Sequence, residues 1–240
     1  MKMADKKRKF FLTHFTKSEL ILWFGSVSLI LLSFIMFDRQ GYLTLFSSLL
    51  AVTSLIYVAK GDPVGQILLI FFVIFYAAIS FSYRYYGEVI TYVFMSLPMT
   101  ILALISWFKN TCSGNKRQVK IGQVGKKEFS LLLLLAVTVT ILFYFLLGML
   151  NTANLIVSTF SVTTSFIAAY LTFRRSPFYA LAYALNDVVL IVLWMLAAID
   201  DVKYLSVAVC FVTFLANDLY GFFNWRRMEK KQADAYKKSK

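Results

Sequence analysis

The chain has 240 residues, of which 60% are hydrophobic, 18% aromatic and only 15% charged, whereas a soluble domain is about 45–50% apolar and 25% charged. This composition excludes an ordinary soluble enzyme, and the apolar residues fall in blocks of about 20, the length that crosses a bilayer. A net charge of +13 would suggest nucleic acid as a partner of a soluble protein. Here the basic residues lie outside the apolar blocks, so we expect them to orient the chain in a membrane and expect no nucleic-acid binding.

Eight apolar blocks follow one another along the chain, and each predicts a membrane-spanning helix. Charged residues or helix breakers separate them, as at Pro63 and Pro177. The connections are mostly short, so sequence neighbours should be antiparallel neighbours in space. In chain order the blocks are 18–37, 41–59, 64–83, 88–108, 129–150, 153–173, 178–199 and 203–225.

The distribution of basic residues predicts the orientation. With eight spans and the N-terminus inside, 22 Lys and Arg residues fall in inner segments and 3 in outer loops. Because cytoplasmic loops carry the excess of such residues, we predict a multi-pass protein of the inner, cytoplasmic membrane with both termini in the cytoplasm. The basic loop 109–128 is a candidate for contact with anionic lipid headgroups, although a solvated connector is the simpler interpretation.

Two groups of three spans follow the same plan. Each begins with a helix rich in Ser and Thr, turns at a proline, and ends its third helix with a tryptophan and a cation, Trp107 in one and Trp225 in the other. Equivalent helices are four spans apart, so the two groups should run in the same direction, an arrangement known from transporters. We therefore predict an all-α integral membrane protein with two parallel three-helix repeats plus an extra N-terminal helix. The segments are a basic tail and peripheral helix (1–40), the first repeat (41–108), a basic loop and linker helix (109–150), the second repeat (151–228) and a basic tail (229–240).

Polar and aromatic residues share helical faces within three of the spans. Aromatic walls with amides suit a planar, neutral or weakly charged ligand that carries hydroxyl groups. The same amides could instead hold helices together, and rings near span ends often mark the membrane interface. The residues that lie on these faces are Gln66 and Tyr76 in the third span, Tyr183, Asn186 and Trp194 in the seventh, and Asn217, Tyr220 and Asn224 in the eighth.

Two acids, Asp187 and Asp218, lie within the apolar blocks, where a carboxylate is costly unless it faces a cavity or a partner. They could serve as a proton relay or ligand anchor, but a neutral, hydrogen-bonded acid beside an asparagine is the plainer interpretation. The chain has a single histidine, His14 in the basic tail, so we expect no metal and no catalytic His. It also lacks a phosphate-binding G-x-x-x-x-G-K-[ST] loop. We expect neither a cofactor nor an enzyme.

Several runs of residues resemble the bacterial Pnu-type nicotinamide riboside transporters. They are Lys60-Gly61-Asp62-Pro63-Val64-Gly65-Gln66, then Tyr85-Tyr86-Gly87-Glu88 through Leu97-Pro98 to Ser106-Trp107, then Ala184-Leu185-Asn186-Asp187 with Leu193-Trp194, and last Asn217-Asp218-Leu219-Tyr220-Gly221-Phe222-Phe223-Asn224-Trp225-Arg226-Arg227. The resemblance covers about residues 40–228. It implies a three-plus-one-plus-three core related to the SWEET sugar transporters. It also implies facilitated diffusion of nicotinamide riboside into the cytoplasm, followed by trapping by a separate cytosolic kinase. The substrate site that it implies comprises Gln66, Tyr76, Asn186, Trp194, Asn217, Tyr220 and Asn224, with Asp187, Asp218 and Tyr183 in support.

Several alternatives stay open at this point. Relatives of this family imply thiamine, riboflavin or deoxynucleosides as other substrates, and nothing local in the sequence excludes them. A membrane-embedded enzyme that uses Asp187 and Asp218, or a receptor that binds without transport, belongs to another class of function. The extra first span leaves open whether the chain forms a homo-oligomer. A phosphate on the ligand would call for Lys or Arg inside the bundle, and the spans contain none at depth.

Overall fold

The computed structural model describes residues 15–82, 86–112 and 115–238. Their secondary structure is almost entirely helical, with one short hairpin of two strands. The elements are α2 (Lys17–Phe37), α3 (Tyr42–Ala59), α4 (Val64–Ser82), α5 (Tyr86–Ile90), the π-helix η1 (Thr91–Ser96), α6 (Leu97–Lys109), β1 (Thr111–Cys112), β2 (Asn115–Val119), α7 (Lys126–Met149), α8 (Leu155–Phe173), α9 (Tyr179–Asp200), the 3₁₀ turn η2 (Val202–Tyr204) and α10 (Leu205–Lys238).

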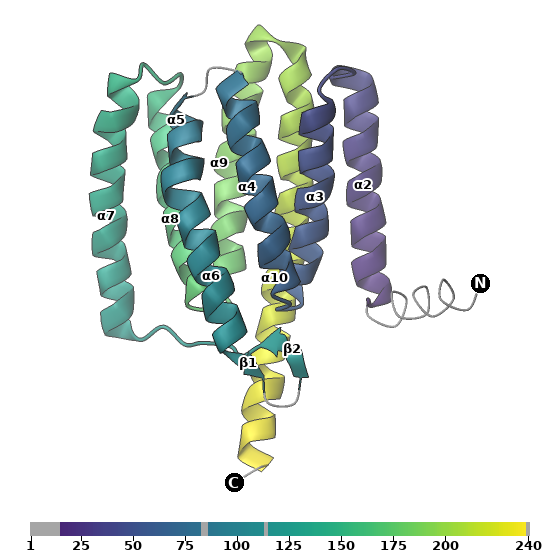
Figure 1. The fold of residues 1–240 in the computed structure, drawn as a ribbon, viewed down its shortest axis with the longest axis vertical. Coiled ribbons are helices and arrows are strands. Elements are labelled where there is room, and N and C mark those ends of the chain that lie inside the picture. The colour runs from purple at the N-terminus through teal and green to yellow at the C-terminus, as the bar shows by residue number, and fades with distance from the viewer. Residues whose placement is uncertain (1–14, 83–85, 113–114, 239–240) are drawn as a thin grey trace, which may run out of the picture.

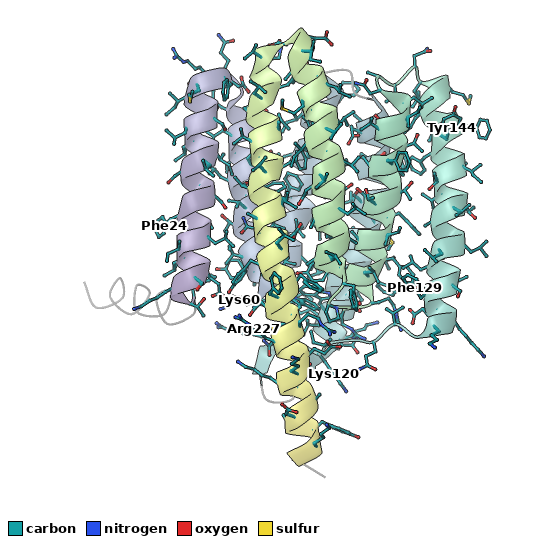
Figure 2. All side chains as sticks on the ribbon, turned by 180° about the vertical axis from the view of Figure 1, so that it is seen from behind. Phe24, Lys60, Lys120, Phe129, Tyr144 and Arg227 are labelled. Atoms are coloured by element: carbon teal, nitrogen blue, oxygen red, sulfur yellow. The ribbon has the colours of Figure 1, made fainter. Side chains whose placement is uncertain are left out.

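Eight segments of the described chain are helical, long and apolar enough to cross a membrane, which confirms the predicted number of spans. They stand side by side as an upright bundle (Figure 1). Large apolar side chains cover its outside, such as Phe24 on α2 and Tyr144 on α7, which are 59% and 45% exposed and point away from the bundle (Figure 2). In water such a surface would be unstable, so lipid must cover it.

The helices pack in an order that follows the two predicted triplets. Helix α3 packs on α4, α8 packs on α9, and α9 packs on α10. The two triplets meet where α10 contacts α3 and where α6 contacts α8. Helix α2 lies against α3 and α10, whereas α7 lies against α8 at the other edge of the bundle (Figure 1).

Helix α2 begins and α10 ends at the same end of the bundle, which we call the terminal end; the opposite one is the far end (Figure 1). Lys60, Lys120 and Arg227 gather at the terminal end (Figure 2). This clustering agrees with the prediction that both tails and the basic loop lie on one side of the membrane.

The basic loop contains structure that the sequence did not predict. Strands β1 and β2 form an antiparallel hairpin, and α10 continues past Trp225 as a helix that leaves the bundle (Figure 1). The two elements support each other, because Gln232 on α10 accepts a hydrogen bond from the Ile121 N–H (2.9 Å) and donates one to the Val119 carbonyl (3.0 Å).

The fourth span is interrupted by the π-helical turn Thr91–Ser96. Pro98 lies in the first turn of α6 and has no N–H to donate to the preceding turn. A switch to i→i+5 hydrogen bonds accommodates such a missing donor, and π turns are frequent at functional sites. Tyr92 in this turn is only 9% exposed and lies in the bundle interior.

Candidate functional site

A cavity of about 80 Å³, which we call the central cavity, lies between the two triplets. Since a cavity needs roughly 10–15 Å³ to hold one water molecule, this cavity is large enough for several water molecules. Among the described residues, no Lys, Arg or His lines it. Its aromatic wall consists of Phe72, Tyr92, Tyr179, Tyr183, Phe211 and Phe214, and its polar wall consists of Gln66, Ser96, Thr100, Ser165, Thr172, Asn186, Asp187 and Asp218.

The two amides in the wall, Gln66 and Asn186, are both predicted site residues. Asn186 is 4% exposed, and its Oδ1 accepts hydrogen bonds from Thr164 Oγ1 (2.8 Å) and Ser165 Oγ (3.0 Å). Gln66 is 1% exposed, and its Nε2 has no hydrogen-bond partner. A buried donor without an acceptor is costly, so Gln66 is set up to donate to a bound molecule.

The two acids that the sequence marked as support, Asp187 and Asp218, also face the cavity. They come from the neighbouring helices α9 and α10, and their carboxyl groups lie within hydrogen-bonding reach of each other. The second oxygen of Asp187, Oδ2, has no hydrogen-bond partner. Because a hydrogen bond between two carboxyl groups needs at least one proton, the pair carries at most one negative charge while that bond is formed.

Tyr76 and Trp194, two further predicted site residues, lie just behind this wall on the side of the far end. The indole Nε1 of Trp194 donates to the Tyr76 hydroxyl (3.1 Å). The Tyr76 ring packs against Tyr92 with centroids 4.4 Å apart, and Tyr92 lines the cavity. Together the three rings form a packed layer on the side of the far end, and we call Trp194, Tyr76 and Tyr92 the aromatic layer.

The three predicted residues on α10 are not brought into the cavity. Asn217 donates to Ser26 Oγ on α2 (2.9 Å), and the Tyr220 hydroxyl donates to the Glu19 carboxylate (3.3 Å). Asn224 Nδ2 donates to a backbone carbonyl at the end of α3 (2.8 Å). In this structure these side chains join helices, and their contact with a ligand stays a prediction.

Sequence reasoning did not single out Phe72, Tyr92, Phe211 or Thr100, all of which line the cavity. A phenylalanine or tyrosine inside an apolar block looks the same whether it faces lipid or a cavity. The one usable signal was Ser96 followed four residues later by Thr100, which places two hydroxyl groups on one face of a helix.

Two buried tryptophans lie behind the cavity wall on the side of the terminal end. Trp107 Nε1 donates to the Thr172 carbonyl and Trp225 Nε1 to the Val58 carbonyl, each at 2.9 Å. Val58 and Thr172 line the cavity. Both indole rings are 0% exposed, and their centroids are 5.3 Å apart. We call these four residues the tryptophan clasp, because each tryptophan binds the other triplet.

Residues 119–122, at the end of strand β2 and just after it, bind both triplets next to the tryptophan clasp. The Val119 N–H donates to the Gly61 carbonyl (2.9 Å), and the Gly122 N–H donates to the Arg175 carbonyl (3.0 Å). Gly61 and Arg175 follow α3 and α8, the first helices of the two predicted triplets, and both have positive φ, +69° and +57°. The side chain of Val119 is 0% exposed. The segment therefore contacts the same position of each triplet.

A wider hollow of about 530 Å³ lies on the outside of the bundle between α5, η1 and α7. It is open, and apolar residues such as Phe94 and Leu142 line it. Lipid chains suit such a groove, whereas an amide or a hydroxyl group finds no partner in it. We therefore place the functional site in the central cavity.

Comparisons with known proteins agree with this architecture. The family model described as nicotinamide mononucleotide transporter matches residues 41–227. The nicotinamide riboside transporter PnuC of Neisseria mucosa is 22% identical over 239 residues, which cover 97% of this chain and 89% of that protein. A crystal structure of the vitamin B3 transporter PnuC superposes with a TM-score of 0.79 at 20% identity, covering 91% of this chain and 94% of the other. That likeness confirms the fold.

Proposed function

The chain belongs to the nicotinamide mononucleotide transporter family, and from that membership we propose that it carries nicotinamide riboside into the cytoplasm by facilitated diffusion. Family membership makes it a membrane transport protein and not an enzyme, as the sequence predicted. A separate cytosolic kinase would phosphorylate the substrate and so trap it. We place the protein in the cytoplasmic membrane with its terminal end in the cytoplasm, because the basic residues gather there.

The observation that carries the proposal is the chemistry of the cavity wall. Rings such as Tyr92 and Phe214 can stack on a pyridine ring, and Gln66 and Asn186 can bond its amide or the ribose hydroxyls. The cavity has no Lys or Arg in its described wall, and a phosphate group needs such partners. This favours the riboside over the mononucleotide for which the family is described.

The acid pair favours the riboside further. The nicotinamide ring of the riboside carries one positive charge, and we propose that Asp187 and Asp218 share one proton when it is bound, so that the pair then carries one negative charge. A buried charge is tolerated where an opposite charge lies beside it. Asp187 lines the cavity in which that ring would lie, and its Oδ2 has no hydrogen-bond partner among the described residues.

For the transport step we propose that one repeat rocks on the other, as in other transporters with parallel repeats. Matched contacts between the triplets support this. Trp107 binds the end of α8 as Trp225 binds the end of α3, and the residue before each tryptophan adds a second bond. Ser106 Oγ donates to the Phe173 carbonyl as Asn224 Nδ2 donates to the Ala59 carbonyl, both at 2.8 Å.

The same correspondence extends to α2 and α7, which precede the triplets. Glu19 in the first turn of α2 pairs with Lys60 after α3 (3.2 Å). Glu128 in the first turn of α7 pairs with Arg174 after α8. We therefore propose that the first helix is the counterpart of the linker helix, although the sequence placed it outside the repeat.

Melting of the purified protein with a panel of ligands tests the substrate. Nicotinamide riboside should raise the melting temperature, since a ligand that binds only the folded state stabilises it. Nicotinamide mononucleotide, thiamine, riboflavin and deoxynucleosides should not. A shift with one of these alone would assign the substrate differently.

Uptake into proteoliposomes tests the mechanism. For facilitated diffusion, labelled nicotinamide riboside should accumulate only to the outside concentration, and enclosing the kinase with ATP should raise the total. A receptor would show the melting shift without any uptake. Accumulation above the outside concentration without the kinase would contradict facilitated diffusion.

A further inference from the structure

Glu88 is a buried acid that the proposed central site does not use. It lies in α5 at the far end of the bundle and is 4% exposed. Its Oε2 is buried, and no described residue hydrogen-bonds it. A carboxylate that is removed from water without a partner is strongly disfavoured. Such a residue is therefore a candidate for contact with a ligand.

Its position in the first turn of a helix does not account for it. An acid there gains from the helix dipole, but this gain is small, and it is largest when the carboxylate also accepts backbone N–H bonds. The described residues contain no hydrogen bond from a backbone N–H to Glu88. The dipole therefore explains why an acid is tolerated at this place but not why it is buried and left without a donor.

A second cavity of about 20 Å³ adjoins this carboxylate, with Thr152, Asn154, Ser158 and Trp194 in its wall. Thr152 Oγ1 is also buried without a hydrogen-bond partner. The hollow has room for one or two waters, so it must widen to admit a larger molecule. We call Glu88, Thr152, Asn154, Ser158 and Trp194 the outer subsite.

The outer subsite lies directly outside the central cavity. Trp194 belongs both to it and to the aromatic layer, whose third member, Tyr92, lines the central cavity. Tyr92 follows Glu88 by four residues, so the two lie on one side of the same span. A molecule that moved from the far end into the central cavity would pass Glu88 first and the three rings next.

We propose that the outer subsite holds the positively charged ring of the substrate before it passes the aromatic layer, with the Glu88 carboxylate as its counter-ion. The proposal rests on the proposed function, because the ligand is the cationic riboside. The indole face of Trp194 adds a cation–π contact, and the Thr152 hydroxyl is available to the sugar. The aromatic layer then separates two acid-bearing sites, Glu88 outside and the Asp187–Asp218 pair inside.

The test compares two ligands of nearly the same shape that differ in charge. Nicotinamide riboside has a cationic ring, whereas its reduced form, dihydronicotinamide riboside, is neutral. Initial uptake of each into proteoliposomes is measured for the wild type, Glu88→Gln and Glu88→Asp. We expect Glu88→Gln to slow uptake of the cationic form about tenfold, as expected for losing one modest charge contact, and to change uptake of the neutral form less than about twofold on the same scale.

Asp201→Asn is the matched control. Asp201 lies at the same end, exposed to solvent, and hydrogen bonds from Lys203 lower the pKa of its carboxyl group, so it contributes a surface charge outside the subsite. This variant should leave the ratio of the two uptake rates unchanged. If it lowers the ratio as much as Glu88→Gln does, general attraction by surface charge explains the effect and the proposal is wrong.

The outcomes separate this proposal from the proposed function. If the wild type moves no nicotinamide riboside, the proposed function fails. If the wild type moves it and Glu88→Gln slows both ligands equally or neither, the outer subsite fails and the proposed function stands. Glu88→Asp keeps the charge on a shorter side chain, so its loss should be smaller and again confined to the cationic ligand. If Glu88→Gln does not fold, Glu88→Asp is the test: a loss confined to the cationic ligand supports the outer subsite, and an equal loss for both ligands, or no loss, overturns it.

Discussion

Replacing a clasp tryptophan by phenylalanine tests whether the terminal end opens by separation of the two triplets. Trp107→Phe and Trp225→Phe keep a ring at sites that are 0% exposed. Each removes one indole N–H and with it one 2.9 Å hydrogen bond to the other triplet. A neutral hydrogen bond contributes about 1 kcal/mol net, and this one exists only while the end is closed. We therefore expect each substitution to raise the population of the open state about fivefold.

A single cysteine in the cavity wall measures that population. Ser165→Cys supplies the reporter in a chain from which Cys112 and Cys210 have been removed, because Ser165 lines the cavity. A membrane-impermeant thiol reagent added on the side of the terminal end should label it about five times faster in each clasp variant. The double variant should be labelled roughly 30 times faster if the two bonds act independently. The ring centroids are 5.3 Å apart. If the increase in the double variant differs from the product of the two single increases, the difference measures the coupling between the two tryptophans.

Trp23→Phe is the matched control for the clasp. Its Nε1 donates to Thr53 Oγ1 (3.1 Å) between α2 and α3, so the substitution removes the same kind of bond from a place outside the clasp. The melting temperature should fall by a similar amount in all three variants, whereas the labelling rate should rise only in the clasp variants. Unchanged labelling of both clasp variants, or an equal rise in Trp23→Phe, would refute the reasoning.

The cavity wall and the terminal ion pairs lead to three further predictions. Gln66→Leu should raise the melting temperature without ligand, because it removes a buried donor that has no acceptor. The same substitution should abolish the rise in melting temperature that nicotinamide riboside causes. Asn186→Leu should lower both the melting temperature without ligand and the rise that nicotinamide riboside causes. Asp218→Asn should weaken binding of the cationic riboside about tenfold by calorimetry and leave its neutral reduced form nearly unaffected, whereas equal weakening of both forms would show that the acid pair does not face the charge of the ring. Glu128→Gln leaves the half-buried Arg174 without its counter-ion, so denaturant melts should show a lower stability, by about 1–3 kcal/mol, with unchanged ligand affinity.

The eight spans could be predicted from the sequence because the membrane imposes a local rule. A helix that crosses the hydrocarbon core needs about 20 apolar residues wherever it lies in the fold. The hairpin follows no such rule. Residues 115–119 read Asn-Lys-Arg-Gln-Val, without the alternation typical of a strand. Their conformation depends on partners far along the chain, since the Val119 carbonyl binds Gln232 and its N–H binds the Gly61 carbonyl.

The site was predicted in part, and α10 shows why. Periodicity grouped Asn217 and Asn224 on one face and left Asp218 and Tyr220 beside it. The structure turns Asp218 to the cavity and Asn217 to Ser26 on α2. Helix α10 packs on α2 and α3 on one side and on α9 on the other, so two of its faces are buried. A pattern of buried polar residues identifies such faces, but only the neighbouring helices decide which of them borders a cavity.

The charges along the proposed path also bear on how the substrate would be retained. A cationic ring meets acids at both sites, Glu88 in the outer subsite and the Asp187–Asp218 pair in the cavity. Once a kinase adds a phosphate, the product brings negative charge to a wall that contains acids and, among its described residues, neither Lys nor Arg. Desolvating a phosphate there without a counter-charge is strongly disfavoured. The same wall that accepts the riboside should therefore exclude its phosphorylated product, so a transporter without any energy source could support net uptake.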